Sequence, residues 1–172
     1  MIHGITVGNI RHPNNKSDIV IGMNTTFADV KGIGAPYIKD IIRTRAITLG
    51  TVITFDFDGT RQLHMLICHK IGRAGWVNAD QHVRYGMDHL WQRDNSRQYS
   101  IVQIGTGRVG KRDGADVPKI IRAIADSHLP VTMFVLNEGE TIPVEATAQV
   151  SPFKPMRMWS KVGGEVPIRV AA

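Results

Sequence analysis

The sequence predicts an α/β fold, a three-layer α/β/α sandwich built around a mixed central sheet. Three observations support this expectation. Short apolar runs of the kind seen in strands buried on both faces alternate with segments of helical periodicity. Two strand-like runs in the middle of the chain flank a hairpin turn. The chain has 172 residues, which suits one domain with one sizeable core.

The first third of the chain predicts two strands, a glycine loop and a helix. Residues 4–10 (GITVGNI) have the β-branched content of a strand, and residues 19–24 (IVIGMN) form a short apolar run. The long loop over 25–36 ends in glycines, and Pro36 suits the first turn of a helix. Apolar residues then recur at helical spacing, namely Ile38, Ile41 and Ile42.

The rest of the chain predicts a hairpin, two helices and two strands before the pattern breaks. Residues 50–70 form the hairpin, with the Asp-Gly of DFDGT at its turn. Residues 79–93 place Val83, Met87, Leu90 and Trp91 on one helical face. The runs at 99–105 and 129–137 predict strands, and 115–127 a helix between them. Four prolines follow Glu138. We therefore expect a domain over 1–137 and a C-terminal extension over 138–172 that packs on it.

The composition limits the classes of partner. The net charge of +6 and the pI near 9.8 favour anionic partners. No run approaches the roughly 18 apolar residues of a membrane span, and the start shows no signal peptide. The single cysteine, Cys68, excludes an internal disulfide and gives no support to a cysteine-based zinc site. We expect a cytoplasmic protein with no membrane partner.

Residues 105–111 (GTGRVGK) fit three phosphate-binding patterns. A dinucleotide fingerprint requires a helix directly at the glycines and an acidic residue about 20 positions later. Here residues 111–116 (KRDGAD) precede the expected helix, and the next strand ends at 137–138. A P-loop requires Ser or Thr after Lys111, and the sequence has Arg112. These departures favour the third pattern, a strand–glycine loop–helix turn that holds a pyrophosphate through backbone N–H groups.

A second glycine loop strengthens this interpretation. Residues 29–36 (DVKGIGAP) also lead from a predicted strand into a predicted helix, and glycine lets the backbone approach a ligand closely. In an open α/β sheet, ligands bind at the carboxyl ends of the strands. Two such loops on neighbouring strands would hold a pyrophosphate from both sides.

The order of these motifs over residues 4–137 resembles the macrodomains, the ADP-ribose-binding family. ITVGNI, IVIGMN, KGIGAPYI, SIVQIGTGRVG and VTMFVL are similar to successive motifs of that family. The resemblance implies ADP-ribose or a related nucleotide as ligand. Asn9 stands where the family has an aspartate that accepts a hydrogen bond from the adenine amine, so the base selectivity is open. The ligand-binding residues implied are Asn9, Ile10, Gly32, Ile33, Gly34, Ala35, Gly105, Thr106, Gly107, Arg108 and Val109.

The hairpin is most similar to the branch that contains terminal ADP-ribose glycohydrolases. That branch uses a lysine on the second hairpin strand and an aspartate in the second glycine loop. Here the aspartate position is Val109, and the lysine position falls on His69 or Lys70, two residues that a strand points to opposite faces. Asn24 could orient a ribose hydroxyl or a water molecule. The candidate catalytic residues are therefore Asn24, His69 and Lys70; Asp29 and Asp113 lie near the loops as substitutes for a missing base.

Three functions remain open at this point. The first is binding of ADP-ribose, with or without hydrolysis of an ADP-ribosyl adduct on a protein or nucleic acid. The second is a non-catalytic module that senses or sequesters a nucleotide-derived signal, which the changes at Asn9 and Val109 favour. The third is nucleic-acid binding through a basic surface. We expect no cofactor and no metal, because four histidines lack metal-ligand spacing: His64, His69, His82 and His89.

Overall fold

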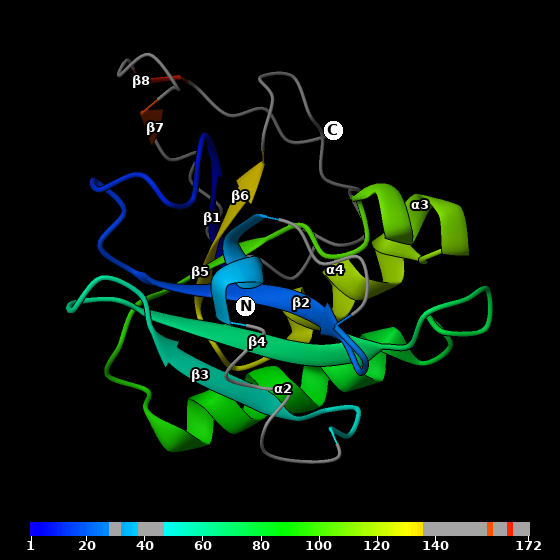
Figure 1. The fold of residues 1–172 in the computed structure, drawn as a ribbon. Helices are drawn as coiled ribbons and strands as arrows, with labels where there is room; N and C mark the ends of the chain where they lie inside the picture. Colours follow the sequence, from blue (N-terminus) through cyan, green and yellow to red (C-terminus); the bar gives the residue numbers. More distant parts are fainter. Residues whose placement is uncertain (28–31, 38–46, 136–157, 160–164, 167–172) are drawn as a thin grey trace.

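A six-stranded mixed sheet forms the centre of the molecule (Figure 1). The computed structural model describes residues 1–27, 32–37, 47–135, 158–159 and 165–166. The strand order is β1-β6-β5-β2-β4-β3, and every neighbouring pair is parallel except β3 and β4. This confirms the predicted mixed sheet. The strands are β1 (Ile2–Val7), β2 (Asp18–Asn24), β3 (Val52–Asp56), β4 (Gln62–His69), β5 (Tyr99–Val102) and β6 (Val131–Val135).

The predicted hairpin is present as β3 and β4. Its turn is closed by Asp58, whose carboxylate accepts hydrogen bonds from the backbone N–H groups of Thr60 and Arg61 at 3.1 and 2.8 Å. Gly59 adopts a φ of 84°, a conformation that glycine reaches without steric cost. β4 is almost continuously buried because it lies between β2 and β3 and is covered on both faces.

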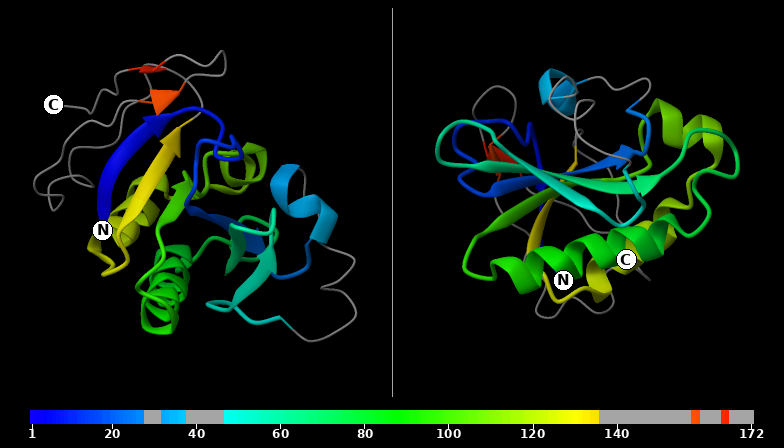
Figure 2. Two further views of the ribbon diagram at one scale, coloured as in Figure 1. Left: turned by 90° about the vertical axis from the view of Figure 1, so that its left-hand side faces the viewer. Right: turned by 60° about the horizontal axis from the view of Figure 1, so that its bottom comes forward.

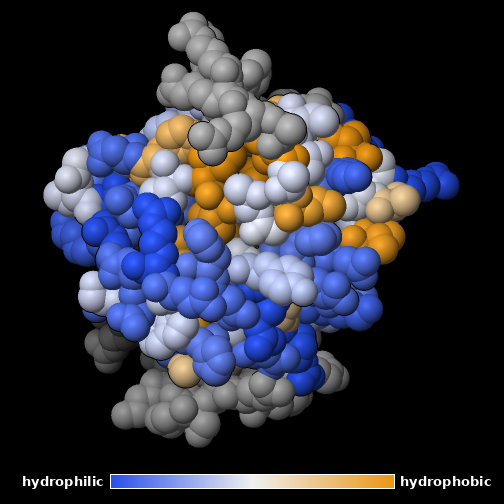
Figure 3. All heavy atoms as spheres, turned by 90° about the horizontal axis from the view of Figure 1, so that it is seen from below, coloured by the Kyte–Doolittle hydropathy of each residue, from blue (hydrophilic) through white to orange (hydrophobic). Residues whose placement is uncertain are grey.

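Helices α2 (Ala79–Arg93) and α4 (Val117–Asp126) cover one face of the sheet (Figure 2). The predicted apolar face of α2 is buried through Val83, Met87 and Leu90. Asp116 caps the N-terminus of α4: its side chain accepts a hydrogen bond from the Lys119 N–H at 3.2 Å. Seen from below in Figure 3, the surface over this layer is mostly hydrophilic, as expected for amphipathic helices with a buried apolar side.

The opposite face carries a second apolar cluster and the short 3₁₀ helix η1 (Gly32–Tyr37), which lies across the sheet from α2 and α4 in Figure 2. Ile33 and Tyr37 of η1 pack against this cluster, which includes Ile21 and Met65. Pro36 lies in the last turn of η1. The helix predicted to follow it, with Ile38, Ile41 and Ile42, lies outside the described residues and remains a prediction.

A further short helix, α3 (Arg108–Asp113), starts directly after the second glycine loop and ends at Gly114, which has a φ of 77°. The expectation that residues 111–116 separate this loop from a helix is therefore wrong. The strand order nevertheless differs from the 3-2-1-4-5-6 order of a dinucleotide-binding sheet.

Two short strands of the C-terminal extension are described, β7 (Met158–Trp159) and β8 (Glu165–Val166), and they form an antiparallel pair. The predicted boundary at residue 137 falls outside the described residues, so the two-part division remains a prediction. Among the residues that the structure describes, no helix combines the length and apolar character needed to cross a bilayer.

Candidate functional site

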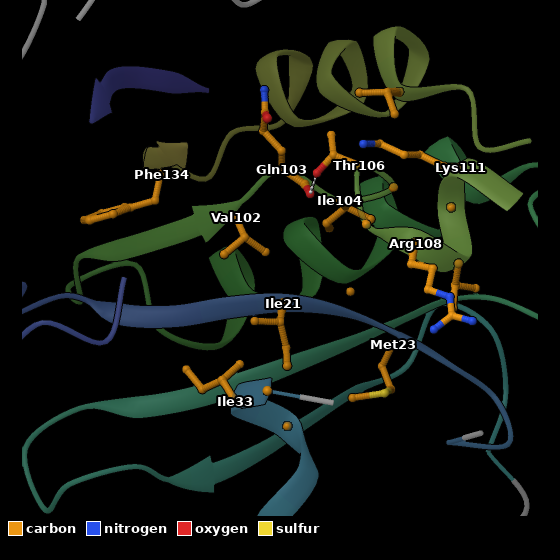
Figure 4. A pocket seen from close by; sticks show the side chains of 18 of the residues that line it. Ile21, Met23, Ile33, Val102, Gln103, Ile104, Thr106, Arg108, Lys111 and Phe134 are labelled. Atoms are coloured by element: carbon orange, nitrogen blue, oxygen red, sulfur yellow. Dashed lines mark hydrogen bonds between the residues drawn. The ribbon is translucent and has the colours of Figure 1, made fainter. Parts of the chain in front are cut away.

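A pocket of about 1170 Å³ lies at the carboxyl ends of the parallel strands (Figure 4). Its lining comes mainly from the carboxyl ends of four strands and the segments that follow them: 8–11, 22–24 with 32–34, 102–112 and 134–135. β2 and β5 are hydrogen-bonded neighbours, so the two glycine loops that follow them face each other across the pocket. The structure thus brings together the two loops that the sequence singled out.

The three glycines of the second loop have different structural roles. Gly105 has a φ of 91°, which favours glycine. A Cβ on Gly110 would lie 2.1 Å from the carbonyl oxygen of Gly105, so this position packs directly against backbone. Gly107 has ordinary dihedral angles and open space where a Cβ would be. Gly107 is therefore the glycine whose missing side chain leaves room in the pocket. Thr106 closes the turn by donating a hydrogen bond to the Gln103 carbonyl at 3.0 Å.

The first loop is anchored by a buried glycine. A Cβ on Gly34 would lie 2.8 Å from the Met23 Cε and 3.2 Å from the Ile21 Cδ1, so η1 sits directly on β2. Gly32 has a φ of 79° and is exposed, with open space around it. Gly32, Ile33 and Gly34 line the pocket, whereas Ala35 does not belong to the lining.

The charges around the pocket have one sign. The ionised side chains in its described lining are Arg11, Arg108, Lys111 and Arg112, and no Asp or Glu belongs to that lining. Figure 4 shows Arg108 and Lys111 on the same side of the pocket, both carried by α3. Arg112 is paired with Asp113 at 2.9 Å. A pocket lined in this way favours anionic ligands.

His69 lies at the end of β4, opposite Asn24 of β2. It lines the pocket, is 6% exposed, and stacks on Trp76 with ring centroids 3.8 Å apart. Burial lowers the pKa of His69 to about 4, and the nearby carboxylate of Asp113 only partly opposes this shift. The imidazole is therefore neutral at pH 7. Lys70, by contrast, is exposed and lies outside the pocket lining.

Two other polar candidates near His69 already have structural partners. The side-chain oxygen of Asn24, which also lines the pocket, accepts hydrogen bonds from the Thr26 N–H at 3.0 Å and from the Thr26 hydroxyl at 3.1 Å. Asp113 is buried, and its carboxylate accepts the Gly72 N–H at 3.1 Å. Asp113 therefore ties the segment after β4 to α3. The substitute base Asp29 lies outside the described residues.

At the other end of the pocket, Asn9 and Ile10 follow β1 and both belong to the lining. Asn9 is exposed, and its Oδ1 accepts the Arg11 N–H at 3.0 Å. Trp76, Phe134 and Arg11 also line the pocket. Sequence reasoning did not identify these three. Trp76 lies in an irregular segment without periodicity. In the sequence, Phe134 cannot be distinguished from an ordinary core residue of a buried strand.

Comparison with solved structures identifies the fold. No protein-family model matches the sequence, and no curated protein matches it as a relative. Among solved structures, the macrodomain of Mycobacterium tuberculosis DarG aligns with a TM-score of 0.57 at 12% identity, over 77% of this chain and 98% of that one. A mutant of the Oceanobacillus iheyensis macrodomain gives 0.56 at 12% identity, over 78% and 84%.

The macrodomain of Thermus aquaticus DarG is similar at a TM-score of 0.52 and 16% identity, over 80% of this chain and 99% of that one. These alignments cover nearly the whole of the DarG macrodomains. The chain therefore has the macrodomain fold, as the order of its motifs predicted. Within the described residues, no group of three or more His, Cys, Asp or Glu side chains is placed to hold a metal ion.

Proposed function

We propose that the protein binds ADP-ribose or a closely related nucleotide in this pocket. The observation that carries the proposal is the facing pair of glycine loops, Gly32–Gly34 and Gly105–Gly107, on the neighbouring strands β2 and β5 of a macrodomain fold. Without side chains at Gly32 and Gly107, phosphate oxygens can reach the backbone N–H groups of both loops.

The sheet order supports an extended ligand. β1 and β4 are four strand positions apart, which corresponds to about 19 Å at the usual spacing of parallel strands. Both glycine loops lie between these strands. A nucleotide would accordingly place its base near Asn9 and Phe134, its diphosphate between the loops, and its distal ribose near His69 and Asn24. The four cationic side chains of the lining would complement the diphosphate charge.

Hydrolysis of an ADP-ribosyl adduct is a second candidate function, and the position of His69 beside Asn24 favours it. A neutral imidazole can accept a proton from an attacking water. A histidine with a pKa of about 4 is nevertheless a weak base, and the described lining contains no carboxylate to replace it. The same observations favour the non-catalytic alternative, a module that senses or sequesters a nucleotide signal. We therefore propose binding as the primary function.

Calorimetric titration with ADP-ribose, with AMP and GDP as comparators, tests the binding proposal. We expect micromolar affinity for ADP-ribose, and we expect Gly107→Glu to abolish it by placing a carboxylate between the loops. The backbone at Gly107 accepts a side chain, so this variant should remain folded. Gln81→Glu on the exposed surface of α2 is the matched control, since it adds the same charge away from the pocket. Absent binding in the folded native chain would refute the proposal.

Turnover of an ADP-ribosylated protein or nucleic acid separates the enzyme from the binding module. If the chain is an enzyme, His69→Ala should slow release of ADP-ribose at least tenfold, because the side chain lines the pocket. Lys70→Ala is the matched control, one residue further and outside the lining, and should have no effect. Loss of turnover in Lys70→Ala with retention in His69→Ala would contradict this assignment.

A further inference from the structure

A chain of hydrogen bonds joins a carboxylate, an imidazole and a hydroxyl at the end of β2 opposite the pocket. The His64 Nε2 donates to the Asp18 carboxylate at 3.0 Å, and the Thr54 hydroxyl lies 2.8 Å from the His64 Nδ1. Asp18 is the first residue of β2, and Thr54 and His64 are paired across β3 and β4. None of these three residues belongs to the lining of the pocket described above.

The partners of His64 determine which of its two nitrogens carries the proton. The Asp18 carboxylate also accepts from the Arg97 Nη2 at 2.8 Å, so towards His64 it is an acceptor. The neutral imidazole therefore has its hydrogen on Nε2, and its Nδ1 is free to accept from the Thr54 hydroxyl. The hydrogen of Thr54 thus points at a base whose other nitrogen is held by a carboxylate.

The base is buried, whereas the hydroxyl lies near the surface. Asp18 and His64 are 2% and 1% exposed, while Thr54 is partly exposed on the edge strand β3. The Tyr99 ring lies beside the imidazole, with ring centroids 5.5 Å apart. Packing of this kind holds the imidazole in place, and a small molecule can approach the Thr54 oxygen from solvent.

A cation lies at the same oxygen. Arg93 is exposed at the C-terminal end of α2, and its Nη1 donates to the Thr54 hydroxyl oxygen at 3.0 Å. Because the oxygen accepts this bond, its own hydrogen remains available for the His64 Nδ1. The positive charge also favours the negative charge that develops around this position when the hydroxyl attacks a carbonyl.

We propose that Thr54 is a nucleophile that takes an acyl group from a small activated ester, with His64 as its general base and Asp18 positioning His64. The order of carboxylate, imidazole and hydroxyl is that of a hydrolase triad, and both distances lie within hydrogen-bond reach. The Thr54 oxygen attacks the ester carbonyl carbon, and its proton moves to the His64 Nδ1. The bond from that carbon to the leaving oxygen then breaks, and the leaving oxygen takes the proton from His64. The products are an acyl ester of Thr54 and a free alcohol or phenol.

Incubation with p-nitrophenyl acetate tests the proposal, with the acetylated residues identified by peptide mass spectrometry. We expect acetylation of Thr54 at least about 100 times faster than that of Thr51, because only Thr54 has a general base. Thr51 is the internal control, since it is exposed and its hydroxyl bonds to the Thr48 hydroxyl at 2.9 Å. Both rates come from one sample of the native chain, so this comparison does not depend on the folding of a variant.

Two pairs of variants assign the roles. Thr54→Val keeps the shape of the side chain and should abolish acetylation at position 54, whereas Thr51→Val should leave acetylation of Thr54 unchanged. His64→Gln should slow acetylation of Thr54 at least about 100-fold in a folded protein. His89→Gln, on the exposed surface of α2, is the matched control and should have no effect.

A purely structural cluster would give a different result. Acetylation of Thr54 no faster than that of Thr51 in the native chain, or no acetyl group on Thr54, overturns the proposal. Acetylation of Thr54 at the native rate in a folded His64→Gln variant also overturns it. The test involves no nucleotide, so its outcome is independent of the proposed binding function.

Discussion

Gly107 and Gly110 lie three positions apart, but a side chain has opposite consequences at the two. At Gly110 the added Cβ would meet the Gly105 carbonyl at 2.1 Å, and a backbone atom cannot rotate away as a side chain can. We expect Gly110→Ala to lower the free energy of unfolding by at least about 2 kcal/mol. Gly107→Ala should change it by less than about 0.5 kcal/mol. Urea denaturation measures both, and similar losses in the two variants would contradict these roles.

His69 makes the stability of the protein depend on pH. Its pKa is 6.5 in the unfolded chain and about 4 in the folded one. Between these values the unfolded state binds more protons, so stability is lost as the pH falls from about 6.5 towards 4. The side chain of His69→Gln cannot titrate. We therefore expect the free energy of unfolding of this variant to fall less between pH 7 and pH 5 than that of the native chain, as measured by urea denaturation. An NMR titration that gives His69 a pKa near 6.5 would show that the burial argument is wrong.

The sequence alone identified both glycine loops but could not decide between His69 and Lys70. That choice depends on the register of β4 against β2, which shifts between Met23 and Asn24. A one-residue irregularity of this kind follows from three-dimensional packing, and the apolar pattern of the sequence does not reveal it. The same limit applies to Asn9, because the orientation of its amide depends on the turn formed with Arg11.

At the scale of elements, β2 is fixed at its N-terminal end by Asp18. Its buried carboxylate accepts hydrogen bonds from the His64 Nε2 at 3.0 Å, the Arg97 Nη2 at 2.8 Å and the Gln62 N–H at 2.9 Å. Burial alone would raise the pKa of Asp18, but these hydrogen bonds outweigh it and hold the pKa well below its usual range. The cluster lies at the end of β2 opposite the pocket.

Asp18→Asn tests this anchor. We expect the free energy of unfolding to fall by about 3 kcal/mol at pH 7, because Arg97 and His64 lose a buried anionic partner. A lowered carboxylate pKa stabilises the fold fully above the unfolded value of about 3.9, and this contribution is lost as the pH falls below it. The difference in free energy of unfolding between the native chain and the variant should therefore become smaller below pH 4.

The control is Asp88→Asn, whose carboxylate forms a partly exposed pair with Arg84 at 3.5 Å. This variant should lower the free energy of unfolding by less than about 1 kcal/mol. Equal losses in the two variants would contradict the anchoring role.

The strands and the helices α2 and α4 could be predicted because their apolar periodicity is long enough to define a buried face. α3 could not, since its six residues include Gly110, two lysine or arginine side chains in the last turn and little apolar surface. In the structure Gly110 packs on Gly105, a contact between backbone atoms that the apolar pattern does not show. The first strand runs over 2–7 and not 4–10, because its partner β6 pairs with it from Ile2 to Val7.

At the scale of the whole molecule, the net charge of +6 is compatible with both a nucleotide pocket and a nucleic-acid surface. The salt dependence of affinity distinguishes them. A ligand with one diphosphate contacts few cations, so we expect its affinity to fall less than about tenfold between 50 and 200 mM salt. A protein that neutralises a run of phosphates loses on the order of 10³-fold or more. Titration with ADP-ribose and with an oligonucleotide at both salt concentrations makes the comparison. A nucleic acid that outcompetes ADP-ribose at 200 mM salt would contradict the pocket as the primary site.

A crystal structure of the protein with ADP-ribose would show where the nucleotide binds. We expect the diphosphate between Gly32–Gly34 and Gly105–Gly107, with phosphate oxygens about 2.7–3.2 Å from backbone nitrogens of both loops. We also expect the distal ribose beside His69. A nucleotide bound on the outer surface, or in the pocket with its diphosphate away from both glycine loops, would contradict the assignment of these loops as the diphosphate site.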